Sequence, residues 1–206
     1  MPTFPTSGRI VAAALSLTVL VVPTACSKDA PAQESPTELL AKAKTTLDTT
    51  SSVHFKLTST DVPSGGTRLI GGEGVAARPP AFQGTLDVFI SGAKVSVDVV
   101  SVGGKVYAKL PFQAGYGVAD PKTLGLKDPA TLIDTETGLS RLVAETFTSS
   151  DPGKPVETVA FVVKDSGELR RAVLKGPFFE PSKNSTFTLV LDQYGAKVAI
   201  SAPPVS

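Results

Sequence analysis

The sequence predicts an α+β fold built on antiparallel β-strands with a few helices. From Val53 onward, apolar residues alternate with polar ones in successive runs, which is typical of strands with one buried face. Turns that contain glycine separate several of these runs. Ahead of the runs, residues 35–47 show the spacing of a helix instead.

The segment SPTELLAKAKTTL, residues 35–47, has the signals of a helix start. Ser35 is a predicted N-cap, Pro36 suits the first turn, and Glu38 completes a capping box with Ser35. Apolar residues then recur at helical spacing and form one narrow stripe, made of Leu40, Ala43 and Leu47.

The period of two predicts strands on both sides of a long irregular segment, residues 111–138. Turns at Ser91-Gly92 and Gly103-Gly104 join three of the strands in a meander, and a short helix that bears Leu139 and Phe147 follows the irregular segment. The predicted strands cover residues 53–57, 69–76, 82–90, 95–99, 106–110, 159–164, 169–175, 186–192 and 197–201.

The predicted sheet is wider than the predicted helices can cover. About eight or nine strands, spaced by about 4.8 Å, span roughly 40 Å, whereas one helix covers about 10 Å. The inward residues are mainly Val, Leu, Ala and Gly, and the chain has no Trp. We therefore expect an under-filled hydrophobic cavity that accepts a long apolar guest. A well-packed core without a cavity and a closed barrel remain the alternatives.

The guest is expected on the apolar face of the sheet, with the mouth of the cavity in the central segment. The strand residues that the alternation places on that face are Phe55, Leu57, Phe82, Leu86, Val88, Val95, Val97, Val106, Phe161 and Leu189. Residues of the irregular segment and of the short helix form the predicted mouth, namely Leu132, Ile133, Leu142 and Val143.

The first 35 residues predict an exported protein held at a membrane. Arg9 precedes an apolar stretch, residues 10–22, that has the length of a signal-peptide core and is too short to span a bilayer. The sequence PTAC ends at Cys26, the only cysteine, and resembles the lipobox of bacterial lipoproteins. We predict a signal peptide (1–25), a lipidated Cys26 with a flexible tether (26–35) and a lipid-binding domain (36–206) on the outer face of the cell membrane. Ordinary secretory cleavage near Ala25 is the alternative.

Composition argues against several functions. If the anchor consumes Cys26, the domain has no thiol for a disulfide, a cysteine metal site or a cysteine nucleophile. The signal peptide contains one basic residue and no acidic one, so removing it leaves 20 − 1 = 19 basic side chains and 19 acidic ones. A neutral domain without charge runs lacks the electrostatic footprint that nucleic acid requires. We predict neither a nucleic-acid partner nor a cofactor.

An enzymatic function is not predicted. The chain has no G-x-S-x-G sequence, and its single histidine, His54, lies on the strand face opposite Val53 and Phe55. We interpret His54 as a solvated strand residue rather than a catalytic base or a metal ligand. The sequence GGEGVAA, residues 71–77, has the spacing of a dinucleotide loop, but the prolines that follow prevent a helix from starting there. We interpret its glycines as bulges or crowded turns of the sheet.

Four stretches give the chain a family resemblance, namely VGGKVYAKL (102–110), DPATLIDTETGLSRLV (128–143), DSGELRRAVL (165–174) and DQYGAKVAISAPPVS (192–206). In them the sequence resembles the LppX/LprG (LppX_LprAFG) family of mycobacterial and related actinobacterial lipoproteins. The resemblance implies a single antiparallel β-sheet, strongly curved as a half-barrel and wrapped around a few helices, similar to that of lipoprotein-localisation carriers. It also implies a hydrophobic cavity that binds acyl chains of envelope lipids, glycolipids or lipoglycans. A lipid transporter is then a candidate partner. After Phe147 the chain is shorter than the resemblance leads us to expect, which would remove a wall of the cavity.

Three functional hypotheses remain after the sequence analysis. The first is an envelope lipoprotein that binds lipids or lipoglycans and carries them or helps to export them. The second is a non-enzymatic accessory or scaffold lipoprotein with a reduced or vestigial cavity. The third is a hydrolase that uses carboxylates which the sequence does not identify.

Overall fold

A nine-stranded antiparallel sheet dominates the computed structural model, which describes residues 34–144, except 91 and 125, and residues 156–206. One α-helix, α1 (Pro36–Thr49), precedes the sheet. Three 3-10 helices follow β6 in the described part of the chain, η1 (Pro121–Leu124), η2 (Pro129–Ile133) and η3 (Leu139–Val143). The strands are β1 (Ser52–Thr60), β2 (Arg68–Ala77), β3 (Ala81–Ile90), β4 (Ala93–Val102), β5 (Lys105–Lys109), β6 (Gly117–Ala119), β7 (Glu157–Val162), β8 (Leu169–Glu180) and β9 (Lys183–Asp192).

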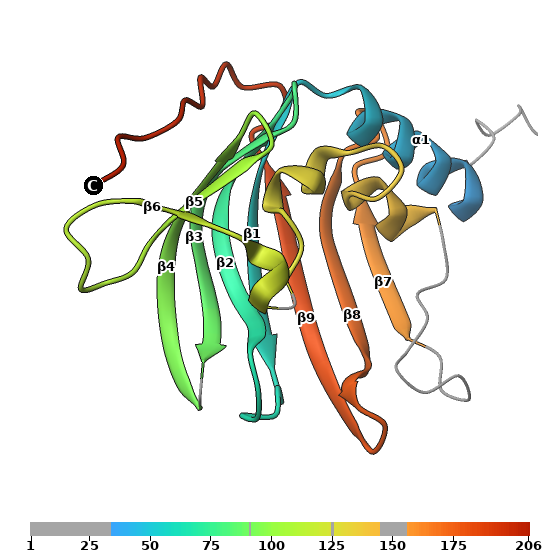
Figure 1. The fold of residues 1–206 in the computed structure, drawn as a ribbon. Helices are drawn as coiled ribbons and strands as arrows, with labels where there is room; N and C mark the ends of the chain where they lie inside the picture. Colours follow the sequence, from blue (N-terminus) through green and yellow to red (C-terminus); the bar gives the residue numbers. More distant parts are fainter. Residues whose placement is uncertain (1–33, 91, 125, 145–155) are drawn as a thin grey trace, which may run out of the picture. The chain divides into compact units, whose positions relative to one another are not determined.

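The strands follow the order β6-β5-β4-β3-β2-β1-β9-β8-β7. Strands β1 to β6 form a meander, and β9 returns to pair with β1, so the first and the last strand lie side by side in the middle of the sheet (Figure 1). The sheet remains open between β6 and β7. The predicted fold, one antiparallel sheet with few helices, is therefore confirmed, and the sheet does not close into a barrel.

Helix α1 begins with the predicted capping box. The backbone N–H of Glu38 donates to Ser35 Oγ at 3.3 Å, and the backbone N–H of Ser35 donates to Glu38 Oε2 at 2.7 Å. At the other end of the helix, the guanidinium of Arg78 donates to the carbonyls of Thr50 and Leu47. These bonds satisfy carbonyls that the helix itself leaves unpaired and fix its end to the β2–β3 connection.

Two details of the chain differ from the sequence prediction. The predicted strand over residues 197–201 is wrong, because these residues lie outside the sheet in an extended tail that ends with a single parallel bridge between Val205 and Tyr116. Pro203 and Pro204 have no N–H to donate to a ladder. The short strand β6 lies inside the segment expected to be irregular, and the short helix predicted after it is the 3-10 helix η3.

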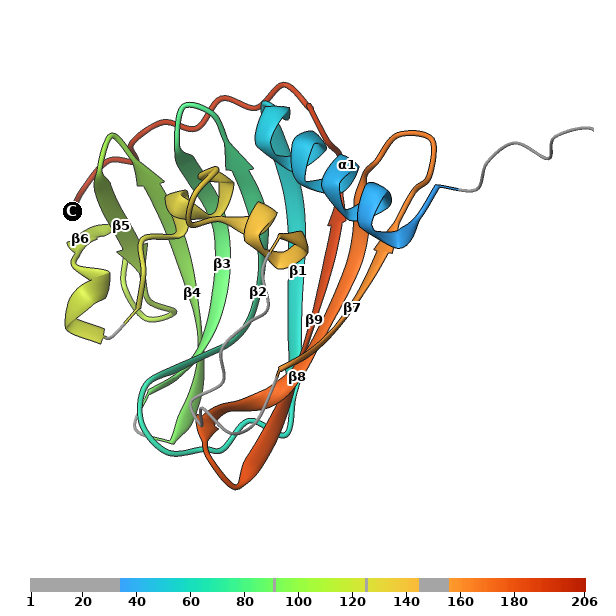
Figure 2. The ribbon, with the colours of Figure 1, turned by 90° about the vertical axis from the view of Figure 1, so that its right-hand side faces the viewer.

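The helical segments lie on one side of the sheet, which curves around them (Figure 2). Helix η2 contacts β2, β3 and β4, while α1 contacts η3 and β7. We call the sheet face that carries these segments the concave face and the other one the outer face. Contacts group residues 34–206 into one compact unit. The predicted signal peptide, Cys26 and most of the predicted tether lie outside the described residues.

Candidate functional site

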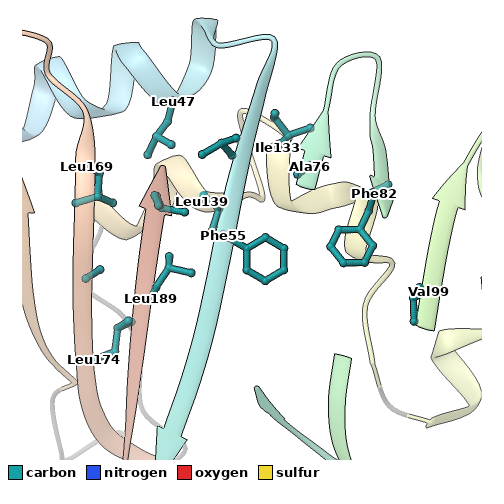
Figure 3. Close-up of a cluster of buried hydrophobic side chains, with 14 of the residues drawn as sticks. Leu47, Phe55, Ala76, Phe82, Val99, Ile133, Leu139, Leu169, Leu174 and Leu189 are labelled. Carbon is teal, nitrogen blue, oxygen red and sulfur yellow. The ribbon is translucent and has the colours of Figure 1, made fainter. Parts of the chain in front are cut away.

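Strand register brings the predicted apolar residues together on the concave face. Leu86 pairs with both Gly72 and Val97, and Leu57 pairs with both Gly72 and Leu189, so these side chains point to the same side. Most of them are buried in one core, part of which Figure 3 shows. The predicted strand residues that lie on this face are Phe55, Leu57, Phe82, Leu86, Val88, Val95, Val97, Val106 and Leu189.

The prediction that Phe161 belongs to this face is wrong. Phe161 pairs with Arg171 on the outer face, where the guanidinium lies 5.8 Å from the ring centre and the Phe161 side chain is 50% exposed. Its neighbour Ala160 pairs with the buried Ala172 and points inward instead. Four successive apolar residues occupy positions 159–162, so the sequence pattern could not decide which of them face the core.

Glycines and one phenylalanine determine how the middle of the concave face is filled. Gly74 and Gly84 pair across β2 and β3, and a Cβ on Gly84 would lie 2.6 Å from the Gly74 Cα and closer still to the Glu73 carbonyl. The Phe82 ring packs over both glycines, is fully buried, and lies 5.7 Å from the Phe55 ring between centroids. The glycines of GGEGVAA thus allow close backbone contact, and a bulge interrupts β2 between Leu69 and Gly71.

A buried hydrogen bond joins the helical cover to the sheet. The Ser101 hydroxyl, which is fully buried on β4, donates to Asp128 Oδ1 at 2.6 Å. The same carboxylate oxygen accepts the Ala130 N–H at 2.9 Å and so caps η2. The sequence analysis missed this pair, although an aspartate directly before Pro129 is a recognisable N-cap signal.

A small hollow lies beneath α1, η2 and η3. It has no room for even a single water molecule, so it is a shallow gap between side chains and not a small-molecule cavity. Two of the predicted mouth residues, Leu132 and Ile133, line it, while Leu142 and Val143 pack against the core partly buried. The complete lining is Leu47, Val53, Leu132, Ile133, Asp134, Leu139 and Ser140.

Beyond the hollow, the concave face carries apolar side chains that are incompletely buried. They lie toward the β3–β4 turn, whereas the Ser101–Asp128 bond fastens η2 near the opposite end of the same two strands. These half-buried side chains, which we call the open apolar strip, are Leu57, Leu69, Leu86, Ile90 and Val95.

The outer face carries the only histidine in a polar network. His54 lies on this face as predicted. Its side chain is only 20% exposed, so it is less solvated than the sequence analysis expects. His54 Nδ1 lies 2.6 Å from Asp192 Oδ1, and Nε2 lies 3.4 Å from Glu73 Oε1. Lys56 Nζ lies 3.0 Å from Glu73 Oε2, and its hydrogen bond is the main cause that lowers the Glu73 pKa. The network joins β2, β1 and β9.

Two further searches concern only the part of the chain that the structure describes. There, His, Cys, Asp and Glu side chains do not gather in any group of three or more suited to hold a metal ion. In the same residues, no helix combines the length and the apolar character needed to cross a membrane.

A family model for the LppX_LprAFG lipoproteins matches residues 35–175, which is well over half of the sequence. The chain belongs to the LppX_LprAFG lipoprotein family. The resemblance seen in the sequence motifs is thereby confirmed. Among curated proteins, none matches the sequence significantly.

Two solved structures show that this LppX_LprAFG member shares the fold of mycobacterial lipoproteins. LprF from Mycobacterium bovis superposes with a TM-score of 0.60 at 15% identity, over 82% of this chain and 96% of that one. LppX from Mycobacterium tuberculosis superposes with a TM-score of 0.51 at 12% identity, over 81% of this chain and 98% of that one. The shortened segment after Phe147 falls in residues 145–155, outside the described residues.

Proposed function

We propose that this LppX_LprAFG protein is an envelope lipoprotein that binds acyl chains of lipids, glycolipids or lipoglycans and carries them or helps to export them. The observation that supports the proposal best is the open apolar strip on the concave face. Leu57, Leu86 and Val95 remain partly exposed there, although nine strands supply a continuous apolar surface around them. An acyl chain would complete their burial.

Binding of this kind is favourable in free energy without specific polar contacts. Each buried methylene contributes about 0.8 kcal/mol, so about ten of them outweigh a considerable cost of ordering the chain. The guest would contact Leu57, Leu86, Val88, Val95 and Val97. Because apolar contact carries little directional information, we expect loose selectivity for the identity of the chain.

The proposed location follows from Cys26. A diacylglycerol on this thiol would supply two acyl chains, which is enough for stable attachment to the outer face of the cell membrane. The protein would then exchange lipid with the bilayer or with a lipid transporter. We assign no catalytic role to any side chain, since His54 is bound in a network on the outer face that links three strands.

One observation favours the second candidate, a non-enzymatic accessory or scaffold lipoprotein with a reduced cavity. Phe82 fills the space above Gly74 and Gly84, and the hollow under the helices has no room for even a water molecule. In this arrangement, the side chains of the protein itself occupy the centre of the concave face. A guest then needs Phe82 to rotate or η2 to move.

Substitution of Val97 by Trp separates the two candidates. Val97 pairs with Leu86 on the concave face and is 8% exposed. If the face holds a guest, the indole occupies space that the acyl chain would fill. Val97→Trp should then lose the copurified lipid while the fold stays stable. Val190→Trp is the matched control, because it adds the same ring on the outer face, where Val190 is 39% exposed.

Native mass spectrometry and thermal melts of the full chain read out both variants. Lipid in the wild type and in Val190→Trp, but not in a stable Val97→Trp, supports the carrier. A wild type without lipid, together with a Val97→Trp destabilised by about 1–3 kcal/mol, supports the scaffold with a solid core. A stable Val97→Trp with a full load of lipid contradicts the location that we propose for the guest.

A further inference from the structure

The turn between β5 and β6 exposes an aromatic side chain that the concave face does not use. Phe112 is fully exposed at the tip of this turn. Leu110 at the start of the turn and Val118 in β6 are also exposed, at 38% and 67%. A fully exposed phenylalanine at the tip of a turn is a candidate for contact with a partner or with a membrane.

Hydrogen bonds hold the turn in its exposed shape. The Gln113 N–H donates to the Leu110 carbonyl at 2.9 Å, and the side-chain carbonyl of Gln113 accepts the Leu110 N–H at 3.2 Å. Pro111 restricts the backbone between them. Because Phe112 stands on an ordered turn, little conformational entropy remains to be lost when its ring is bound.

The composition of this turn fits the interface of a lipid bilayer. The ten residues 110–119 contain no charged side chain, and they include Phe112 and Tyr116. Aromatic rings of this kind concentrate at the headgroup level of membranes. The tip of the turn can therefore insert without desolvating a charged side chain of its own. Near its base, burial and the charge of Asp98 raise the pKa of Tyr116.

Lys109 lies at the base of the turn and supplies a positive charge that is complementary to anionic headgroups. It lies opposite Asp98 in the sheet, yet it forms no ion pair with Asp98 or with any other residue in the described ranges. Its methylenes can stay beside apolar groups while its ammonium reaches an anionic headgroup.

We propose that the β5–β6 turn, residues 110–116, inserts into the interface of an anionic lipid bilayer. The inference rests on the proposed anchoring through Cys26 but not on lipid carriage. The nine residues after Cys26 up to Ser35 extend at most about 30 Å, so an anchored domain stays close to the bilayer.

The turn and the first helix of the domain lie at different edges of the sheet. Helix α1 contacts β7 at one edge, whereas the turn leads into β6 at the other edge (Figure 1). The turn would therefore give the domain a second membrane contact that is separate from its amino-terminal attachment.

The chain has no Trp, so a single introduced indole reports on its own surroundings. We compare Phe112→Trp with Val190→Trp, which places the indole at a partly exposed position on the outer face of β9, a central strand. The full chain is reconstituted into vesicles of equimolar phosphatidylcholine and phosphatidylglycerol, with brominated phosphatidylcholine as the quencher. We expect the Phe112→Trp emission to shift to shorter wavelength and to be quenched, while Val190→Trp changes little.

Three results would overturn the proposal. The first is equal quenching of both reporters, or none in either. The second is a Phe112→Trp shift that appears without vesicles and grows with protein concentration, which indicates a second copy of the chain as the partner. The third is quenching that is unaffected when Lys109→Gln is added, because the proposal attributes the preference for an anionic bilayer to Lys109. A protein that carries no copurified lipid should still show the expected quenching. Failure of the carrier function is therefore distinguishable from failure of this membrane contact.

Discussion

The hydroxyl of Ser101 and the carboxylate of Asp128 are joined by a 2.6 Å hydrogen bond that couples the sheet to the segment covering it. Ser101 belongs to β4 and Asp128 caps η2, so one partly buried carboxylate oxygen contacts both the start of a helix and the sheet beneath it. Hydrogen bonds to charged acceptors are stronger than neutral ones. This pair therefore controls how firmly η2 is held over the concave face.

Removal of the Ser101 hydroxyl tests that coupling. We expect Ser101→Ala to lower the free energy of unfolding by about 1–2 kcal/mol, because a fully buried hydroxyl is removed and the partly buried carboxylate of Asp128 loses a donor. Chemical denaturation followed by circular dichroism measures the change. Ser96→Ala is the control for loss of a hydroxyl, since Ser96 donates to Asp87 on the outer face, where exposure to water weakens the effect. Equal losses in both variants would contradict a special role for Ser101.

The close contact of β2 and β3 makes a second prediction. Gly84→Ala places a Cβ 2.6 Å from the Gly74 Cα, so the strands must separate, and we expect a loss of about 2–3 kcal/mol in unfolding free energy. Gly117→Ala is the matched control, because it also lies in a strand but a Cβ there meets no atom within 4 Å. Thermal melts compare the two. If Gly84→Ala melts at the same temperature as Gly117→Ala and the wild type, the crowding that we describe is absent.

Acid should destabilise the fold partly through Asp87. The hydrogen bond from Ser96 at 2.5 Å and the nearby ammonium of Lys94 hold the pKa of Asp87 below its usual value, although burial opposes them. A carboxylate with a lowered folded pKa stabilises the protein above its unfolded pKa of about 3.9, and this contribution is lost as the pH falls through the folded pKa. Melting temperatures recorded below about pH 4 should thus fall less steeply for Asp87→Asn than for the wild type. If the melting temperatures of Asp87→Asn and the wild type fall in parallel with pH, Asp87 makes no such contribution.

The anchor proposal makes a prediction about Cys26. Cys26→Ala removes the thiol that would carry diacylglycerol, so we expect either an uncleaved precursor or a released soluble form. Membrane fractionation and mass spectrometry of the amino terminus distinguish these products. Conversion of Ser27, the next residue, to Ala is the control and should leave processing intact. A Cys26→Ala protein that still carries diacylglycerol would contradict the anchor.

Local signals predicted the elements of this fold well. The capping box of Ser35 and Glu38 and the alternation in β1, β3 and β4 each depend on neighbours in sequence, and the structure confirms them. Where a run of apolar residues lacks alternation, as around Phe161, the face depends on pairing with β8, which is distant in the sequence. The extended tail after β9 has the composition of a strand, but it has no ladder partner over residues 197–201.

The candidate site was only partly predictable for a related reason. Its strand residues follow from the period of two, but the contact of Gly74 with Gly84 requires the register of β2 on β3. Likewise, the Ser101–Asp128 bond depends on where the chain places η2 after a long connection. Register and loop placement are set by the complete core, and no short stretch of sequence encodes them.

The pairing of β1 with β9 also constrains how the chain acquires its structure during export. Asp192 lies 138 residues after its neighbour His54, so the centre of the sheet forms only once nearly the whole polypeptide is available. Until then, one edge of β1 has no partner strand, and unpaired edges are prone to association with other chains. Contacts of such long sequence separation slow folding. A polypeptide that emerges amino terminus first across a membrane therefore remains incompletely folded until β9 has crossed.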